Sequence, residues 1–199
     1  MISKRNATYQ DVLDAPEHLV AELLDGDLVL SPRPGGRHSS VASLLGGELL
    51  PPFRHGRGGP GGWVILDEPE LRLGARVLVP DLAGWRIERL PVVPEKFTVV
   101  PDWVCEIASP STEKLDRGRK LPLYAAAGVR HCWMIHPQLR MLEILRLHAG
   151  QWLSVGVYID DEKVCAEPFE ALELDLANLW LGLPLRASEL TESALHETW

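Results

Sequence analysis

The sequence contains few cysteines and lacks long apolar runs. Only 3 of its 199 residues are cysteine, and Cys105, Cys132 and Cys165 lack the C-x-x-C spacing typical of a structural zinc site. Each lies in an apolar stretch, which predicts buried, reduced thiols and argues against a disulfide scaffold. No stretch approaches about 18 uninterrupted apolar residues, so we expect no membrane span. The first residues lack the apolar core of a secretory signal, and we therefore expect a cytoplasmic protein.

Basic residues are also scarce, with 20 Lys and Arg against 28 Asp and Glu, a net charge of -8. Such a balance is unusual for a protein that binds nucleic acid. The excess is confined to residues 151–199, which hold 10 acidic and 2 basic side chains and so leave 18 of each sign in residues 1–150. Net charge therefore does not exclude a nucleic-acid substrate, but it predicts weak and salt-sensitive binding.

Hydrophobic patterns predict a mixture of helices and strands. Helices are expected at residues 8–13, 38–50, 112–127 and 176–180, and strands at 19–24, 28–30, 63–66, 77–85, 103–108, 132–135, 142–147 and 152–158. Asp25-Gly26 is typical of a type I′ hairpin turn, and Gly128 of a helix C-terminus. Pro122 predicts a kink or a late start in its helix. This order of elements favours one α/β or α+β domain over residues 1–199.

Two carboxylates interrupt apolar strands. Asp81 lies in Val77–Trp85 and Glu106 in Trp103–Ala108. A carboxylate among apolar neighbours needs a counter-charge, a metal ion or a proton. Two carboxylates on adjacent strands suit a shared Mg²⁺ ion, and pairing with a buried arginine or capping of a loop is the alternative. Asp102 is unsuitable as a partner of Glu106, because four residues along one strand separate them by about 13 Å.

Lys120 and Glu22 are further candidates. Lys120 lies on the predicted helix after the Glu106 strand, where a lysine can neutralise charge that develops on a phosphate. Lys114, Arg117 and Arg119 are competing cations, and a solvated helix face is the alternative for each. Glu22 interrupts the apolar strand at 19–24, as a fourth member of the site or as an edge-facing residue.

These residues resemble the Uma-type family of restriction endonuclease-like proteins of bacteria, a branch of the PD-(D/E)XK nuclease superfamily. The matching positions are Pro80-Asp81, Glu106 within 104–112, Asp116, Lys120, Tyr124, Gly128-Val129 and Trp133. The hairpin at 22–29 and His38 also match. The resemblance covers a core of roughly residues 8–180 and leaves 181–199 as an acidic C-terminal tail.

The resemblance implies a restriction endonuclease-like core, a mixed β-sheet flanked by helices with an N-terminal β-hairpin. It also implies cleavage of phosphodiester bonds in DNA with Mg²⁺, or alternatively Mn²⁺. Asp81 and Glu106 would be metal ligands, Lys120 the catalytic lysine and Glu22 a further catalytic acid. The superfamily's lysine follows the acid by two residues, where this sequence has Ala108, so Lys120 would replace it from the next helix. We expect a homo-oligomer, specifically a dimer.

Basic side chains gather between residues 33 and 57. Arg33, Arg37, His38 and Arg57 are predicted substrate contacts, and this Arg-rich segment is expected beside the proposed metal site. The Gly-rich loop at 56–62 has backbone N–H groups that could approach phosphates. A flexible solvated loop is the alternative. Two other functions stay open. One is a non-catalytic homo-oligomeric or DNA-binding relative, in which Lys120 would point away from Asp81. The other is a hydrolase of small phosphorylated substrates.

Overall fold

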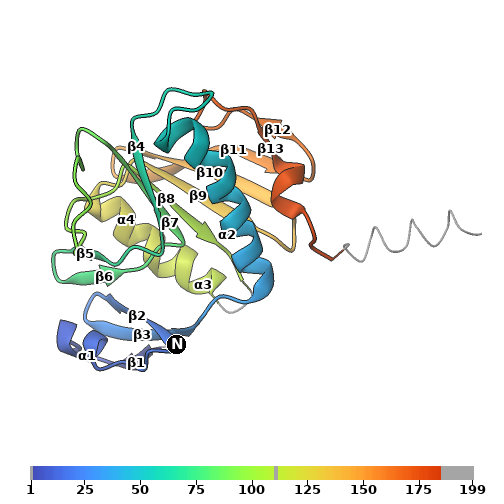
Figure 1. The fold of residues 1–199 in the computed structure, drawn as a ribbon. Coiled ribbons are helices and arrows are strands. Elements are labelled where there is room, and N and C mark those ends of the chain that lie inside the picture. Colours follow the sequence, from blue (N-terminus) through green and yellow to red (C-terminus); the bar gives the residue numbers. More distant parts are fainter. Residues whose placement is uncertain (1, 110–111, 185–199) are drawn as a thin grey trace, which may run out of the picture.

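The computed structural model describes residues 2–109 and 112–184 (Figure 1). Pro110 and Ser111, and residues 185–199 of the predicted acidic tail, lie outside the described residues. Within these ranges the chain forms a six-stranded sheet, a five-stranded sheet and one two-stranded pair. None of the described helices is long and apolar enough to cross a membrane. The predicted mixed α/β class is confirmed.

The six-stranded sheet forms the centre of the structure. Its order is β11 (Gln151–Ile159), β10 (Met141–His148), β9 (His131–His136), β8 (Trp103–Ile107), β7 (Leu82–Arg86) and β4 (Trp63–Asp67). Only β8 and β9 of this sheet are parallel neighbours. A parallel pair needs a crossover connection. The crossover consists of α3 (Glu113–Leu115), a π-helical turn (Asp116–Lys120) and α4 (Leu121–Ala127).

The five-stranded sheet contains the predicted N-terminal hairpin. Its order is β1 (Ile2–Lys4), β3 (Asp27–Pro32), β2 (Leu19–Leu24), β6 (Arg76–Leu78) and β5 (Leu71–Leu73). Asp25 and Gly26 have φ angles of 50° and 82°, and these two left-handed residues confirm the type I′ turn. The short helix α1 (Tyr9–Leu13) covers this sheet. Its N-cap residue, Thr8, forms a capping box with Asp11.

Buried side chains cover both faces of the six-stranded sheet. On one face, α2 (Gly36–Leu49) and the π-helical turn Leu50–Arg54 pack onto a tryptophan-rich layer around Phe169. The pair β12 (Lys163–Val164) and β13 (Leu174–Asp175) and the 3₁₀ helix Leu176–Trp180 complete that layer. On the other face, α4 and the inner side of the five-stranded sheet bury a second cluster. A site between the two sheets is therefore held from both sides.

The segment predicted as one strand at 77–85 is divided between the two sheets, which corrects the sequence interpretation. Its first residues form β6 of the five-stranded sheet and its last form β7 of the six-stranded sheet. Pro80 interrupts the ladder because it has no N–H to donate. Asp81 consequently lies at the passage between the sheets, and not within a strand.

Two further predictions need adjustment. The predicted helix at 112–127 includes a π-helical turn before α4 begins at Leu121, so Pro122 falls in the first turn of α4, where its missing N–H costs little. Gly128 ends α4 with a φ angle of 85°, as predicted. The prediction of three buried thiols is wrong for Cys165, which is exposed in the short segment after β12, whereas Cys105 and Cys132 are buried in the sheet.

Candidate active site

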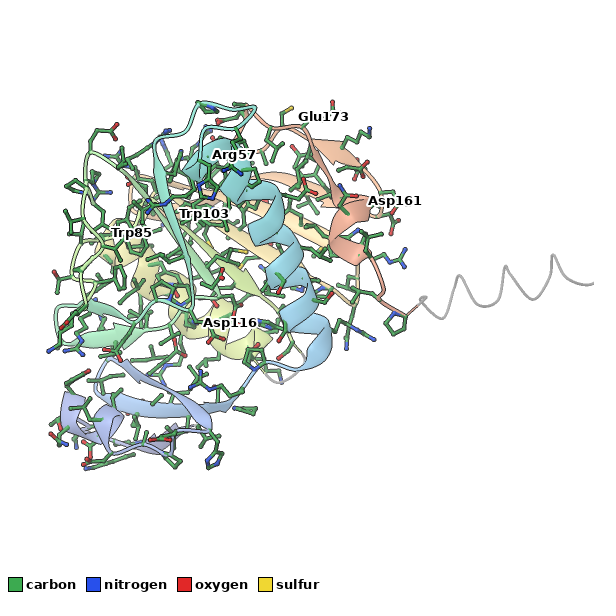
Figure 2. The ribbon with its side chains drawn as sticks, viewed as in Figure 1. Arg57, Trp85, Trp103, Asp116, Asp161 and Glu173 are labelled. Carbon is green, nitrogen blue, oxygen red and sulfur yellow. The ribbon has the colours of Figure 1, made fainter. Side chains whose placement is uncertain are left out.

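A cavity of about 320 Å³ lies between the two sheets and contains most of the predicted site residues. Its lining includes five carboxylates, one lysine, one arginine and one histidine: Glu22, Glu68, Asp81, Glu106, Asp116, Lys120, Arg33 and His38. The fold brings together residues that lie up to 98 positions apart in the sequence, from Glu22 to Lys120. Figure 2 labels Asp116 at the level where α3 and the five-stranded sheet come together.

Lys120 forms the centre of the cavity's floor. Its Nζ lies 2.8 Å from Glu106 Oε1 and 3.2 Å from Glu22 Oε1, and it donates to the Val79 carbonyl at 2.9 Å. Asp116 Oδ1 is 3.9 Å away on the same π-helical turn. Burial lowers the pKa of Lys120, but these carboxylates outweigh it and raise the pKa well above its usual value. The lysine is therefore a fixed positive charge and does not act as a base.

Glu106 extends from β8 toward α4. Strand alternation places it on the same face as Val104, as predicted, and that face is covered by the crossover helix. Tyr124 of α4 donates its hydroxyl to Glu106 Oε1 at 2.5 Å. Burial raises the pKa of Glu106 well above its usual value, although the charge of Lys120 opposes this. Glu106 is thus a carboxylate that needs further positive charge to stay ionised.

Asp116 belongs to the same site because it lies four residues before Lys120 on the helical crossover. Residues four apart share one helix face, and Asp116 and Lys120 are both buried at the two ends of the π-helical turn. Burial raises the pKa of Asp116 to about 6, and the charges of Asp81 and Glu22 add to this. Single-turn π segments often occur at functional sites.

Asp81 is held in place by two hydrogen bonds. The backbone N–H of Ile107 donates to its Oδ2 at 2.5 Å, and His38 Nε2 lies 2.8 Å from its Oδ1. Burial lowers the pKa of His38, but the hydrogen bond and charge of Asp81 outweigh it and leave the pKa raised. His38, predicted as a substrate contact, therefore positions Asp81 in this structure.

Glu22 approaches the site from the five-stranded sheet. In β2 it shares a face with Leu24, which packs into the cluster against the six-stranded sheet. Its Oε1 accepts from the Val79 N–H at 2.8 Å. This orientation resolves the open alternative in favour of a cavity-facing residue. Among the competing cations, Arg117 pairs with Glu143 and Arg119 with Asp27, away from the carboxylate floor.

The predicted substrate contacts divide into two groups. Arg33 lies at the cavity rim, 3.4 Å from Glu68, and Arg37 is exposed in the first turn of α2. Arg57 is not among the lining residues, and Figure 2 shows it at the opposite end of α2 from Asp116. The expectation that the Arg-rich segment lies beside the carboxylates holds for Arg33 and fails for Arg57, because the 14-residue α2 separates the two ends of that segment. A helix of that length spans about 21 Å.

For two residues of the site, Asp116 and Tyr124, the sequence showed a match to the Uma-type family but predicted no role in the site. Tyr124 and Asp116 carry no pattern that announces a buried polar contact, since a tyrosine among alanines and an aspartate among arginines are ordinary on a helix. Asp102, excluded from the site by spacing, pairs with Arg89 at 2.6 Å and accepts from the Arg86 N–H. Its separate role agrees with the sequence argument.

A carboxylate-lysine cluster at the end of a strand pair in a mixed sheet, with a helical crossover above it, defines a restriction endonuclease-like protein. The chain belongs to the Uma2 family, described as "Putative restriction endonuclease", which it matches over residues 7–177. This agrees with the resemblance recognised in the sequence.

Solved structures give the same fold. Five solved chains match significantly, and one is a protein of Anabaena variabilis described as a "putative nuclease belonging to DUF820". It is 22% identical, with a TM-score of 0.69, and the match covers 87% of this chain and 97% of that chain. At this identity the likeness shows the fold alone. The comparison with curated proteins gave no significant match.

Proposed function

We propose that the protein is a metal-dependent endonuclease that hydrolyses phosphodiester bonds of DNA. The observation that carries the proposal is the floor of the cavity, where Glu22, Asp81, Glu106 and Asp116 surround the single charge of Lys120. Membership of the family described as restriction endonucleases supports the same activity. The non-catalytic alternative predicts that Lys120 points away from Asp81. Lys120 lines the same cavity as Asp81 and lies 2.8 Å from Glu106, which favours the nuclease.

The charge balance of the floor suits a divalent cation. Burial raises the pKa of Glu106 and of Asp116, so ionising both carboxylates requires more positive charge than Lys120 supplies. Asp81 and Glu106 would hold Mg²⁺, or Mn²⁺, through carboxylate oxygens, which are the donors these ions prefer. Within residues 2–109 and 112–184, no three such side chains already converge as a ligand set, so water and phosphate oxygens would complete the coordination.

Each residue then has a defined task. A bound Mg²⁺ would supply an acidified water and neutralise phosphate charge. Lys120 holds a permanent positive charge beside Glu106 and stabilises negative charge that develops on the phosphate. Tyr124 orients Glu106, and His38 orients Asp81. These bonds fix the two ligands before substrate arrives, which reduces the reorganisation needed during reaction.

The rim of the cavity fits a phosphate-bearing substrate. The N-terminus of α2 lies at the cavity, because its N-cap residue Gly35 and His38 of its first turn both line the cavity. The first turn has neither a side-chain cap nor an acidic residue. Its free N–H groups and the helix dipole favour an anion there. Arg33 and Arg37 add positive charge beside this helix end. The rim therefore attracts the substrate that the acidic floor alone would repel.

The test is cleavage of supercoiled plasmid and labelled oligonucleotides in Mg²⁺ or Mn²⁺, together with calorimetric titration of the metal. We expect Asp81→Asn and Glu106→Gln to lower cleavage by about a thousandfold and weaken metal binding. Lys120→Met should lower cleavage while the protein still binds metal. The exposed Glu88 offers a matched control, and Glu88→Gln should behave as wild type. Absence of both cleavage and metal binding in the wild type would refute the proposal.

Oligomeric state is a separate prediction. The expected dimer is checked by light scattering after size-exclusion chromatography of the full chain. A mass of 44 kDa, twice the 22.1 kDa of one chain, would support it, and 22.1 kDa at micromolar concentration would contradict it.

A further inference from the structure

The six-stranded sheet has an exposed edge at β11. This strand is the last in the order of its sheet, and within residues 2–109 and 112–184 it pairs with β10 alone. None of its nine residues is buried, whereas β4, the strand at the other edge, begins with three buried residues. An edge strand presents a row of backbone N–H and C=O groups to which another strand can bind. β11 is therefore open to a further strand.

The side chains of β11 are unusual for an exposed edge. Four of them are large, apolar and exposed: Leu153 at 48%, Val155 at 37%, Val157 at 53% and Ile159 at 50%. The strand contains no Asp, Glu, Lys, Arg or Pro, although charges and proline are what proteins commonly use to protect an open edge. A bulge at Val155 interrupts the strand, but four residues on either side of it stay in register with β10. Such a surface is typical of a site of protein interaction.

The charges beside β11 favour a second copy of the same chain as the partner. Asp160, Asp161 and Glu162 follow the strand directly, whereas the turn before it, Ala149-Gly150, is uncharged. When two β11 strands pair antiparallel, the acidic end of each copy lies beside the uncharged turn of the other. The two acidic ends are then about 30 Å apart, several times the screening length at physiological salt. A charged partner strand would lose hydration without finding an opposite charge on β11, and an identical uncharged strand would not.

The bulge determines how two copies can align. Ser154 lies opposite Leu145 of β10, which belongs to the buried cluster on the α4 face of the sheet. Val157 lies opposite Glu143, which in turn lies opposite Met134 of the same cluster. Residues directly opposite each other in antiparallel strands share a face, so Ser154 and Val157 are both on the α4 face.

A two-fold axis between Val155 and Gly156 brings matching faces together. It places Ser154 of one copy opposite Val157 of the other, and the symmetry produces this contact twice. The next pair on the same face is Trp152 with Ile159, an aromatic side chain beside a β-branched one, which is a favourable cross-strand pair. The exposed apolar side chains on this face are thus covered by the second copy.

We infer that two copies of the chain form a dimer by pairing their β11 strands antiparallel, which joins the two six-stranded sheets into one continuous sheet. This interface assigns a surface to the dimer expected from the sequence. It goes beyond the proposed nuclease function and would form whether or not the chain cleaves DNA.

The test measures the mass of the full chain and its variants by light scattering after size-exclusion chromatography, over a range of concentrations. Val157→Lys places a charge on the edge, opposite Glu143 of its own chain, so the variant should fold normally, as circular dichroism would show. It should weaken the dimer by about tenfold or more and move the mass toward the 22.1 kDa of one chain. Val92→Lys is the matched control, because Val92 is 76% exposed in the connection between β7 and β8, and it should behave as wild type. A Val157→Lys dimer as tight as that of the wild type would overturn the inference.

Opposite charges test the register. The double variant Ser154→Glu/Val157→Lys places an acid opposite a lysine across the axis, twice in each dimer. It should dimerise about fivefold or more tightly than Val157→Lys alone. No recovery in the double variant would overturn the proposed pairing of Ser154 with Val157.

Hydrogen exchange of the wild type identifies what covers β11. Amides of Gln151–Ile159 should exchange more slowly as the protein concentration rises through the range of dimer formation. A dimer in which these amides exchange equally fast at all concentrations would use another surface and would overturn the inference. A monomer at micromolar concentration would overturn it as well, and protected β11 amides in that monomer would show that the chain covers its own edge.

Discussion

The six-stranded sheet buries large clusters on both of its faces, whereas the outer face of the five-stranded sheet buries a cluster of four side chains among the described residues. The first cluster contains Trp63, Trp103 and Trp133 around Phe169, with ring centroids 4.8–5.6 Å apart. The five-stranded sheet packs its inner face against the six-stranded sheet and carries α1 on its outer face. Both sheets nevertheless supply carboxylates to the same cavity.

The two sheets contribute different residues to the cavity. Glu106 lies in β8 of the well-packed sheet, and Asp116 and Lys120 lie in the crossover that follows β8, so their relative positions are fixed by the core of that sheet. Glu22 lies in β2 of the less deeply packed sheet, and the rim residue Arg33 follows directly after β3 of the same sheet. Glu106, Asp116 and Lys120 thus lie on the part of the molecule with the larger buried clusters, and Glu22 and Arg33 lie on the part with less buried area.

The largest effect should come from the tryptophan cluster. Trp103 is fully buried and packs edge-on against Trp133 and Phe169. Trp103→Ala should lower the free energy of unfolding by about 3–5 kcal/mol, because it leaves a large cavity in the core. Urea denaturation followed by circular dichroism measures this. A loss below about 1 kcal/mol would contradict the central role of the six-stranded sheet.

The free energy of unfolding should depend on pH through Asp116, which lines the cavity between the two sheets. The pKa of Asp116 is about 6 in the folded protein because of burial, compared with 3.8 ordinarily. The folded state then binds more protons than the unfolded state between these values, so this contribution to stability falls as the pH rises from about 4 to 6. Glu106 shifts in the same direction and extends the loss to higher pH. Burial is the main cause of the raised pKa of Asp116; the charges of Asp81 and Glu22 add to it, and the charge of Lys120 and a hydrogen bond with Thr112 oppose it.

Without divalent cations, the titration of Asp116 should cost the wild type up to about 3 kcal/mol of unfolding free energy between pH 4 and pH 7. The Asp116→Asn variant should lack this loss. Unfolding free energies of the two proteins at both pH values give the difference, which cancels the titration of other groups. Identical pH slopes for the two proteins would show that Asp116 titrates normally.

The outer cluster of the five-stranded sheet should tolerate change better. Leu28 packs with Val12, Leu23 and Val77 beside partly exposed neighbours that can relax into the space. Leu28→Ala should therefore cost about 2 kcal/mol, the lower end of the range for such changes. Amide hydrogen exchange should accelerate in β2 and β3 more than in β8 and β9. Equal acceleration in both sheets would contradict the contrast between them.

The smallest effects should distinguish the rim from the distant loop. Arg33→Gln should raise KM for an oligonucleotide by about three- to tenfold at low salt, because it removes one phosphate-attracting charge. Arg57→Gln should leave KM unchanged, since α2 separates it from the cavity. Equal effects of the two substitutions would indicate that the Gly-rich loop contacts the substrate after all.

Much of the fold could be predicted from local pattern. The Asp25-Gly26 turn, the C-terminus of α4 at Gly128 and the strands that became β2, β4, β8, β9, β10 and β11 follow from turn chemistry and hydrophobic periodicity. The division of residues 77–85 between two sheets did not follow, because Val77 to Trp85 is apolar apart from Asp81 and only Pro80 marks the break. Strand pairing is decided by non-local contacts that periodicity does not record.

For the site, the sequence by itself determined which residue types break the apolar pattern. Asp81 and Glu106 stand out because a carboxylate in a buried strand is costly without a partner. Tertiary structure alone decided that Lys120 and Glu22 meet Glu106, that His38 and Tyr124 orient the acids, and that Arg57 lies elsewhere. The reason is physical: periodicity fixes the face on which a side chain lies, whereas the packing of two sheets and a crossover helix fixes which faces meet.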